Sequence, residues 1–459
     1  MSTICAISTA PGAGGIAVIR VSGSDAFSIC DKIFLPKKAG KTLSTQKAYT
    51  LSFGSIVNKG ETIDEVIAAV FRAPHSFTGE DTVEISCHGS VYIQQQILQA
   101  LISNGCRMAQ AGEYTQRAFL NGKMDLSQAE AVADLIASTS AGQHRLALSQ
   151  MRGGFSKELA ELRDKLLHFT SLMELELDFS DHEELEFADR SELTALANNI
   201  EQVISRLAQS FSVGNAIKNG VPVAIIGETN AGKSTLLNAL LNEEKAIVSD
   251  IHGTTRDVIE DTININGQLY RFIDTAGIRE TNDTIEALGI ERSFKALEQA
   301  QIVILMYDLS RDMKDFETFY HEIAPKLANK SVILAMNKCD LMTSEKLPSV
   351  SFSKNWHPIA ISAKSKTHLL ELQQLLTDIA GLTTLQQNDI IVTNARHFEA
   401  LTHALEAIHR VQEGLSANIS GDFISQDLRE CIYHLSDIVG EVTTDQVLQN
   451  IFKNFCIGK

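Results

Sequence analysis

The stretch Gly227-Glu228-Thr229-Asn230-Ala231-Gly232-Lys233-Ser234 decides the fold of the chain around it. It matches the phosphate-binding loop pattern G-x-x-x-x-G-K-[ST] at every defined position. An apolar run, residues 221–226, precedes it, and a helix-forming run, residues 235–240, follows. A strand, a loop and a helix in this order let backbone N–H groups surround a phosphate at the positive end of the helix. The stretch therefore predicts an α/β domain that binds a nucleotide.

Individual loop residues have distinct expected roles. Lys233 should reach the β- and γ-phosphate oxygens, and the Ser234 hydroxyl should ligate Mg²⁺. Asn230 offers a neutral oxygen that suits a monovalent cation, K⁺, beside the phosphates. We therefore regard Lys233 and Asn230 as candidate catalytic residues. The loop residues expected to contact the nucleotide are Asn230, Ala231, Gly232, Lys233, Ser234 and Thr235.

Three further segments, each directly after an apolar run, indicate that the base is guanine. Asp340 in Asn337-Lys338-Cys339-Asp340 would pair with the N1–H and the exocyclic amine of guanine, a donor pair that adenine lacks. A site built around such hydrogen bonds rejects the wrong partner by roughly 10⁴–10⁵. The segments after residues 269–273, 332–336 and 358–361 supply these expected GTP contacts: Asp274, Thr275, Ala276, Gly277, Asn337, Lys338, Asp340, Ser362, Ala363 and Lys364. Four motifs in this order predict a GTPase.

The segment over residues 250–257, between the loop helix and the Asn266-Gly267 turn, is the candidate first switch. Thr255 would ligate Mg²⁺ when a γ-phosphate is present, and oxygens of Ser249, Ile251 and Thr254 would complete a K⁺ shell with Asn230. A flexible polar loop without this role is the alternative. The switch residues expected to contact GTP are Ser249, Asp250, Ile251, His252, Gly253, Thr254 and Thr255. The following Asn266-Gly267 predicts a hairpin with a type I′ turn.

The expected catalysis differs from that of the small GTPases. They carry a glutamine after Asp-Thr-Ala-Gly to orient the attacking water, whereas Ile278 stands here and cannot hydrogen-bond. Glu286 is the candidate that positions the water instead. A solvated helix carboxylate is the competing interpretation of Glu286.

The composition limits the classes to which the chain can belong. With 459 residues, 44% hydrophobic and 21% charged, it is globular and long enough for about two to four domains. It has no apolar run that could span a bilayer and neither a signal nor a presequence pattern at its N-terminus. Seven cysteines without a C-x-x-C pair favour a reducing compartment. We expect a cytoplasmic protein that does not bind a membrane.

The net charge of −17 constrains the partners. A protein that held nucleic acid over its whole surface would be basic, so any RNA contact must use a local patch or a second protein. The acidic run over residues 174–186 contributes to the imbalance. It is either a solvated helix end and loop or a docking surface for a basic partner.

The pattern along the chain predicts a multidomain protein. Residues 1–118 are expected to form an α+β domain, residues 119–217 the first part of a helical domain, residues 218–382 an inserted α/β GTPase domain of the P-loop, Ras-like type, and residues 383–459 the second helical part. Gly214-Asn215 and Asn219-Gly220 on one side, and residues 383–388 on the other, are the candidate linkers.

The end of the chain, Cys456-Ile457-Gly458-Lys459, admits three interpretations. Cysteine fourth from the end is typical of a prenylation box, but Gly458 and Lys459 fit neither preferred class and no polybasic stretch precedes them. A thiol after an apolar helix end can instead be aimed inward, at another domain's pocket. Simple disorder is the third.

Taken together, these residues resemble the MnmE (TrmE) family of bacterial tRNA-modification GTPases over essentially the whole chain. Besides the GTPase motifs, the resemblance rests on residues 253–257, on Ser76-Phe77-Thr78-Gly79-Glu80-Asp81, on Arg117-Ala118-Phe119-Leu120-Asn121-Gly122-Lys123 and on the Cys-Ile-Gly-Lys end. Thr229 and His252 are minor departures from the family pattern.

The resemblance implies a folate-binding N-terminal domain that forms a homodimer, and GTPase domains that pair in the GTP state with K⁺ in the arginine-finger position. It implies a heterotetramer with MnmG, which brings FAD and NADH, and tRNA as the substrate. The reaction places an aminomethyl or carboxymethylaminomethyl group on carbon 5 of the wobble uridine. The one-carbon source is a 5,10-methylene or 5-formyl derivative of tetrahydrofolate, and glycine or ammonium supplies the nitrogen.

By the same resemblance, Arg20, Glu84, Lys123 and Lys459 bind folate, and Cys456 is a candidate catalytic residue near that pocket. Arg20 and Lys123 suit the folate carboxylates or a polar pterin edge, and Glu84 suits the paired donors of the pterin. Two other classes remain open: a regulatory ribosome-assembly or translation GTPase without modification chemistry, and a folate-dependent methyltransferase in which GTP is ancillary.

Overall fold

The computed structural model divides the chain into two compact units, which are described separately. One comprises residues 1–137, 147–204 and 399–459, and the other residues 138–146 and 205–398. The described residues are 1–38, 40–178, 190–244, 260–273, 295–311, 313–327, 330–342, 356–381, 390–442, 444–453 and 455–458.

The first unit begins with a seven-stranded mixed sheet in the order β3-β4-β5-β6-β2-β1-β7. The strands are β1 (Ile4–Ile7), β2 (Ile16–Ser22), β3 (Phe34–Pro36), β4 (Thr50–Asn58), β5 (Glu61–Phe71), β6 (Thr82–His88) and β7 (Arg107–Met108). Alternate residues of β2 are buried and pack with α1 (Ala26–Ile33) and α2 (Val91–Ser103) on one face of the sheet. This period of two leaves the opposite face for polar groups such as Arg20 and Glu84.

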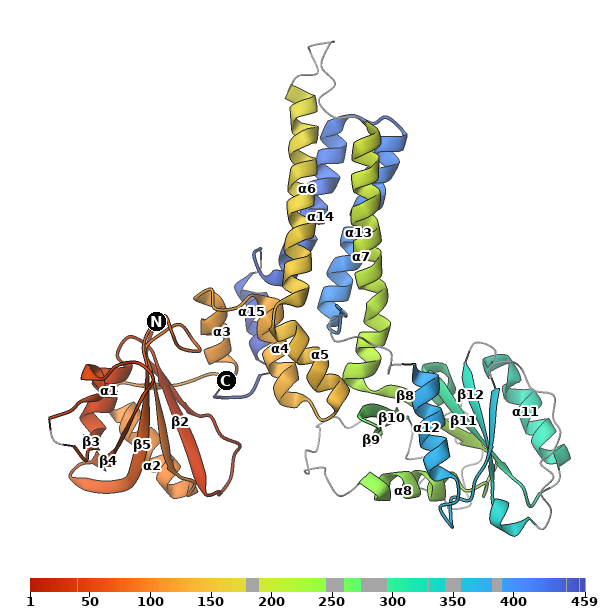
Figure 1. Ribbon diagram of the computed structural model, residues 1–459, viewed down its shortest axis with the longest axis horizontal. Coiled ribbons are helices and arrows are strands. Elements are labelled where there is room, and N and C mark those ends of the chain that lie inside the picture. The colour runs from red at the N-terminus through yellow and green to blue at the C-terminus, as the bar shows by residue number, and fades with distance from the viewer. Residues whose placement is uncertain are drawn as a thin grey trace. The chain divides into compact units, whose positions relative to one another are not determined.

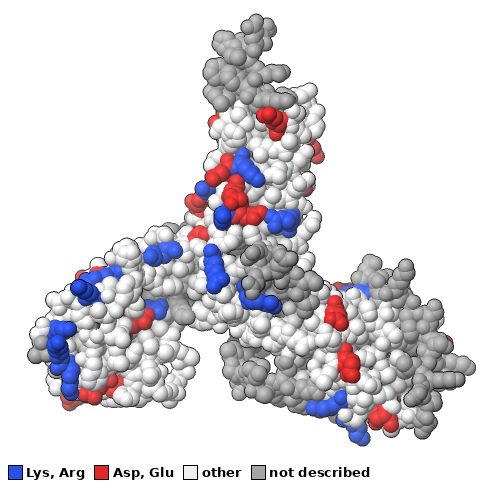
Figure 2. Space-filling model, viewed as in Figure 1, with Lys and Arg blue, Asp and Glu red and all other residues white. Residues whose placement is uncertain are grey.

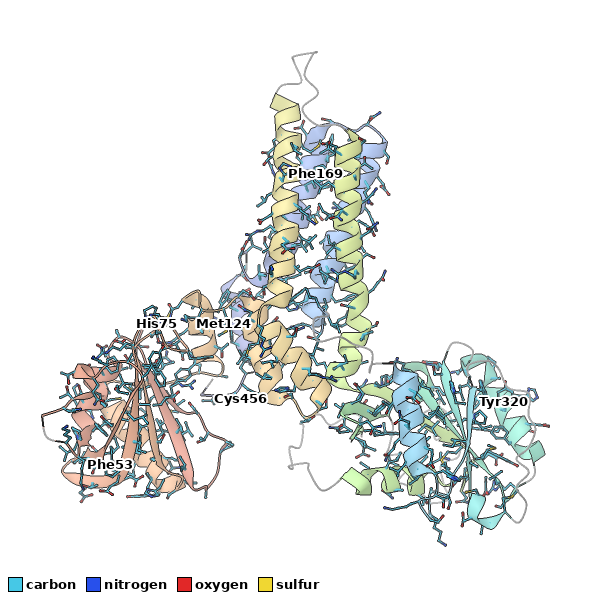
Figure 3. The ribbon with its side chains drawn as sticks, viewed as in Figure 1. Phe53, His75, Met124, Phe169, Tyr320 and Cys456 are labelled. Atoms are coloured by element: carbon cyan, nitrogen blue, oxygen red, sulfur yellow. The ribbon has the colours of Figure 1, made fainter. Side chains whose placement is uncertain are left out.

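The same unit contains amphipathic helices, several of them long (Figure 1). They are α4 (Leu126–Ala137), α6 (Gly154–Asp178), α14 (Gly421–Val439) and α15 (Asp445–Phe452), with parts of α7 (Arg190–Asn219) and α13 (Ala395–Ser416). Buried residues of α6 recur at helical spacing, from Leu159 and Leu162 to Leu166 and Phe169, which Figure 3 shows between the helices. The periodicity predicted from about residue 126 is therefore present.

The second unit is built on a six-stranded sheet in the order β13-β12-β11-β8-β10-β9. The strands are β8 (Val221–Gly227), β9 (Asp261–Ile265), β10 (Gln268–Phe272), β11 (Ile302–Asp308), β12 (Ser331–Asn337) and β13 (Trp356–Ala360), and all are parallel to their neighbours except β9. Helices α8 (Lys233–Glu244) and α12 (Leu369–Ala380) pack on one face, and α11 (Met313–Leu327) packs on the other (Figure 1). This arrangement is the expected α/β class.

Two local predictions in the second unit have opposite outcomes. The hairpin at Asn266-Gly267 is confirmed, with φ of 53° and 80° joining β9 to β10. The linker expected at Gly214-Asn215 is wrong, because α7 continues through both residues to Asn219. A Cβ at Gly214 would lie 2.0 Å from the Val392 carbonyl oxygen, so this glycine permits close packing within a helix.

The contact boundaries of the two units fall inside α7 and α13, near residues 204 and 399. The short α5 (Ala141–Met151) is divided between the units as well. Residues 382–389, which contain the other expected linker, lie outside the described residues. Among the helices that the structure describes, none is long and apolar enough to cross a membrane.

Candidate functional site

The phosphate loop joins the end of β8 to the start of α8. Lys233 Nζ donates to the carbonyl oxygens of Gly227 at 2.7 Å and Glu228 at 2.9 Å. Burial lowers the pKa of Lys233, and the negative charge of Glu228 opposes part of that shift. The ammonium group is therefore held inside the loop, where the sequence places it against phosphate oxygens.

The loop needs glycine at two positions because a backbone carbonyl lies close to one and a side-chain amide lies close to the other. A Cβ at Gly227 would lie 2.6 Å from the Met306 carbonyl oxygen. Gly232 has a φ of +98°, and its Cβ would lie 2.2 Å from Asn337 Nδ2. Asn230 also has a positive φ, 65°, a conformation that asparagine tolerates better than most residues. These constraints shape a backbone cradle that fits the phosphates of a nucleotide.

Asn337 joins this loop to the segment expected to contact the base. Its Nδ2 donates to the Ala231 carbonyl oxygen at 2.8 Å, and its Oδ1 accepts from the Ala363 N–H at 3.0 Å. The side chain is 3% exposed, so both bonds are shielded from water. Three segments predicted from the sequence, at residues 227–234, 337–340 and 362–364, are thus brought together.

The base-contacting residues differ in burial. Ser362 is buried, and its hydroxyl accepts from the Ser365 N–H at 3.2 Å, whereas Asp340 and Lys364 are exposed. Asp340 lies in a 3₁₀ turn, Cys339–Leu341, that follows Lys338 in the left-handed conformation. Exposed donors and acceptors beside a buried anchor suit the edge of a purine ring.

A charged network beside these loops was not predicted from the sequence. Asp308 Oδ2 lies 2.5 Å from Lys338 Nζ and 3.8 Å from Arg311 Nε, and Arg311 Nη1 lies 3.3 Å from Glu228 Oε2. Burial alone would raise the pKa of Asp308, but hydrogen bonds from Lys338 and Ser310 outweigh it and lower that pKa. The position of Asp308 directly after the apolar residues 302–307 was the available signal.

The first unit holds the polar residues that the resemblance assigned to folate. Arg20 and Glu84 lie on neighbouring strands and pair, with Nη2 to Oε1 at 2.7 Å. The Arg20 guanidinium lies 5.5 Å from the ring centre of Phe77 and 5.6 Å from that of Tyr114. Burial raises the pKa of Tyr114, whose hydroxyl donates to the Arg20 carbonyl oxygen at 2.7 Å. A charged pair whose arginine lies near two aromatic rings suits a flat heterocycle with polar edges.

Lys123 lies at a loop formed by residues 73–82. Its Nζ donates to the Pro74 carbonyl oxygen at 2.9 Å, and Asn121 Nδ2 donates to the Thr78 carbonyl oxygen at 2.7 Å. The two motifs at residues 76–81 and 117–123 are therefore in contact.

Sequence comparisons identify the family of the chain. The chain matches the family profile described as GTP-binding protein TrmE N-terminus over residues 3–123, and that of the MnmE helical domain over residues 126–456. A tRNA modification GTPase MnmE of Parabacteroides distasonis is 84% identical, with all of both chains covered. The chain belongs to the MnmE (TrmE) family of tRNA modification GTPases.

Other MnmE relatives span the chain as completely. The Bacteroides fragilis protein is 67% identical and the Flavobacterium johnsoniae protein 52%, each covering 100% of this chain and 99% of its own. Among solved structures, Aquifex aeolicus Era bound to GDP·AlF4⁻ is 26% identical over 40% of this chain and 65% of its own. Its TM-score of 0.25 is too low to support a fold assignment.

Arg117, in one of the motifs behind the MnmE resemblance, proves to be a buried junction. Its guanidinium is 2% exposed and contacts both oxygens of Glu80 at 3.0 Å, Glu113 Oε1 at 2.9 Å and the Ser2 carbonyl oxygen at 2.7 Å. Burial alone would raise the pKa of Glu113, but Arg107, the Gln110 N–H and Arg117 bring it down to about 2. This junction supports the loop that carries Phe77.

The end of the chain contacts the N-terminal domain in this MnmE member. Ile457 forms an antiparallel bridge with Ala111, and the Gly112 N–H donates to the Cys456 carbonyl oxygen at 3.3 Å. The Cys456 side chain is exposed, and Figure 3 labels it near the end of the chain.

Several predicted residues lie outside the described part of the chain. They are Ser249, Asp250, Ile251, His252, Gly253, Thr254, Thr255, Asp274, Thr275, Ala276, Gly277, Ile278, Glu286 and Lys459. Most of the acidic run over residues 174–186 lies outside it as well. On the face that Figure 2 shows, Lys and Arg lie in small groups near Asp and Glu.

Proposed function

We propose that this chain hydrolyses GTP to drive the modification of tRNA at carbon 5 of the wobble uridine, adding an aminomethyl or carboxymethylaminomethyl group together with the FAD-dependent protein MnmG. The observation that carries the proposal is the Asn337 bridge between the phosphate loop and the base-contacting segment, in a chain of the MnmE family. The described part of the guanine-nucleotide site, on a chain of this family, supports GTP-driven tRNA modification over simple tRNA binding.

Each nucleotide-site residue has a proposed task. Lys233 holds the β/γ-phosphate oxygens, Asp340 reads the guanine edge, and Ser362 with Ala363 borders the base. Ser234 and Thr255 would hold Mg²⁺, which when bound neutralises charge on the phosphate oxygens. The inward position of Lys233 and the glycines that shape the loop fit a phosphate group with its metal.

The groups that would orient the attacking water and balance the charge on the phosphate differ from those of the small GTPases. Asn230 would supply a K⁺ ligand with Ser249, Ile251 and Thr254, and its φ of 65° places it in the left-handed conformation. Glu286 would orient the attacking water in place of the absent glutamine. The remaining GTP contacts, from Asp274 to Gly277, follow the end of β10.

The N-terminal face would bind a tetrahydrofolate derivative, 5,10-methylene or 5-formyl, which when bound supplies the one-carbon unit. The Arg20–Glu84 pair would hold the polar edge of the pterin, Phe77 and Tyr114 would border its ring, and Lys123 with Lys459 would hold the carboxylates of the tail. Half-buried charges with aromatic neighbours fit such a ligand. Cys456 would act beside it, with glycine or ammonium as the nitrogen source.

The assembly would be a cytoplasmic homodimer that forms a heterotetramer with MnmG, and MnmG would carry FAD and NADH. The charge of −17 supports a division of labour in which MnmG supplies part of the tRNA contact.

The test is mass spectrometry of wobble uridines from cells that lack this protein. Complementation with the wild-type chain should restore the modified nucleoside, whereas Asn337→Ala should not. An unchanged pool of modified uridine in the deletion strain would assign the chain to the regulatory GTPases instead.

A further inference from the structure

The last described residues lie against the N-terminal domain through their backbone. Ile457 bridges to Ala111, and the Gly112 N–H donates to the Cys456 carbonyl oxygen at 3.3 Å. The Ser8 hydroxyl donates to the Gly458 carbonyl oxygen at 3.1 Å. Backbone contacts of this kind fix the path of a segment independently of its side chains.

Two glycines make this contact possible, one on each side. Gly112 has a φ of +65°, and a Cβ there would lie 2.8 Å from the Phe452 carbonyl oxygen and 2.9 Å from Phe455 Cβ. Gly458 has a φ of +98°, and a Cβ there would lie 2.3 Å from the Ile7 carbonyl oxygen. Because backbone atoms stand at these distances, a single added methyl group must displace the segment.

This contact is connected through the fold to the candidate folate residues. Ile7 pairs with Ile19, the neighbour of Arg20 in β2. Gly112 immediately precedes α3 (Glu113–Leu120), which carries Tyr114 and its hydrogen bond to the Arg20 carbonyl oxygen. The segment and the Arg20–Glu84 pair therefore share a supporting framework.

We propose that Gly112 is a positioning residue that seats the C-terminal segment on the N-terminal domain and thereby fixes where the Cys456 thiol is presented. The seating stands on the geometry alone, whereas its effect on tRNA modification rests on the function proposed above for Cys456. A side chain at position 112 releases the segment without touching the nucleotide site.

The cysteines allow the seat to be tested in the full chain. Five of the seven are buried, Cys339 is half-buried and Cys456 is exposed. A thiol-reactive nitroxide at one equivalent will therefore label Cys456 first, and peptide mapping will verify the site. Its electron paramagnetic resonance line shape then reports how mobile the segment is.

The variant is Gly112→Ala, and the matched control is Gly60→Ala. Gly60 has a φ of +85° but no heavy atom within 4 Å of its Cβ position, so it carries the backbone strain without the collision. Gly112→Ala should convert an immobilised spectrum to a mobile one and lower wobble-uridine modification in cells at least about tenfold, with GTP hydrolysis unchanged. Gly60→Ala should change none of these.

Gly458→Ala changes the C-terminal side of the same contact and should also increase the mobility of the label. It therefore tests the proposal even if Gly112→Ala folds poorly. An immobilised label in both variants, or full modification despite a mobile segment, overturns the proposal. If Cys456→Ser still supports full wobble-uridine modification, the role proposed for the thiol is wrong. The position of the C-terminal segment is then tested by the spectra of the labelled glycine variants alone.

Discussion

The nucleotide site of the second unit and the polar face of the first are held together by different forces. In the nucleotide site, the buried bridge between the loops is neutral, as Asn337 joins Ala231 to Ala363, and each ion pair beside it includes a partly exposed side chain. In the N-terminal domain, ion pairs connect the elements, with Arg117 buried between Glu80 and Glu113. Loss of a neutral bridge should impair ligand binding first, whereas loss of one buried charge should impair folding first, because its partners remain charged.

The largest expected effect tests the ionic side of this comparison. Arg117→Ala leaves Glu80 and Glu113 without their common partner, and breaking a buried pair in this way costs about 3–5 kcal/mol of stability. Calorimetry of the full chain should show one unfolding transition shifted downward. The single tryptophan, Trp356, lies in the second unit and packs edge-on to Tyr320, with 5.3 Å between the ring centres. Its fluorescence should therefore show that the unfolding transition of the second unit is not shifted.

Arg429→Ala is the control for Arg117→Ala. Arg429 pairs with Glu174 at 2.5 Å in the same unit but is exposed, so its loss should cost no more than about 1 kcal/mol. Equal shifts for the two variants would contradict the distinction between buried and exposed pairs.

Acid should weaken the same junction without any substitution. The pKa of Glu113 is about 2 in the folded chain, below its ordinary value of 4.5, so its contribution is complete above pH 4.5. It is lost as the pH falls through about 4.5 to 2, and amounts to about 3 kcal/mol. Urea titrations across that range should show a steeper loss of stability for the wild type than for Glu113→Gln. Parallel slopes would remove Glu113 as the titrating group.

The neutral side of the comparison is tested by Asn337→Ala. The variant leaves the Ala231 carbonyl and the Ala363 N–H unpartnered, at about 1–3 kcal/mol for each buried group, so GDP affinity should fall about 10- to 100-fold. Titration of a fluorescent GDP analogue measures this, with Trp356 fluorescence showing that the domain stays folded. Asn238→Ala, at an exposed position of α8, is the control. Loss of folding before loss of affinity would break the comparison.

How far the sequence could predict these sites depends on how far apart the contacting residues lie along the chain. The phosphate loop and the Asn266-Gly267 turn depend on consecutive residues whose backbone preferences are local, and both were predicted. The Arg117 junction joins residues 115 positions apart, and the Asn337 bridge spans 106. The sequence motifs contain Arg117 and Asn337, but only the fold identifies the residues that these two side chains contact. Gly214 shows the opposite outcome. The sequence suggested a linker there, but Gly214 lies within a helix, because the Val392 carbonyl is too close for a larger residue.

Asn230 tests whether the phosphate loop also binds a cation. If it supplies a K⁺ ligand, GTP hydrolysis should be at least about tenfold faster in potassium than in sodium, a fraction of the 10³–10⁵ that an arginine finger provides. Asn230→Ala should remove the difference and leave GDP affinity within a few-fold. Asn230→Gly is the matched variant because glycine accepts the φ of 65° without strain. Equal wild-type rates in both salts would end the cation hypothesis.

Arg311 provides the smallest effect, where the two kinds of contact meet. It pairs with Glu228 of the phosphate loop at 3.3 Å, but the two side chains are 39% and 19% exposed, so the pair contributes only about 0.2–1 kcal/mol. Arg311→Ala should therefore speed GDP dissociation about two- to fivefold at low ionic strength, and the difference should vanish in high salt because screening weakens exposed pairs. Lys326→Ala, which removes a pair of the same 3.3 Å length with Glu298, should leave dissociation unchanged. If the faster GDP dissociation of Arg311→Ala does not depend on salt, packing of the guanidinium is its cause. If the effects of Arg311→Ala and Glu228→Gln on GDP dissociation are additive, the ion pair does not couple the two loops.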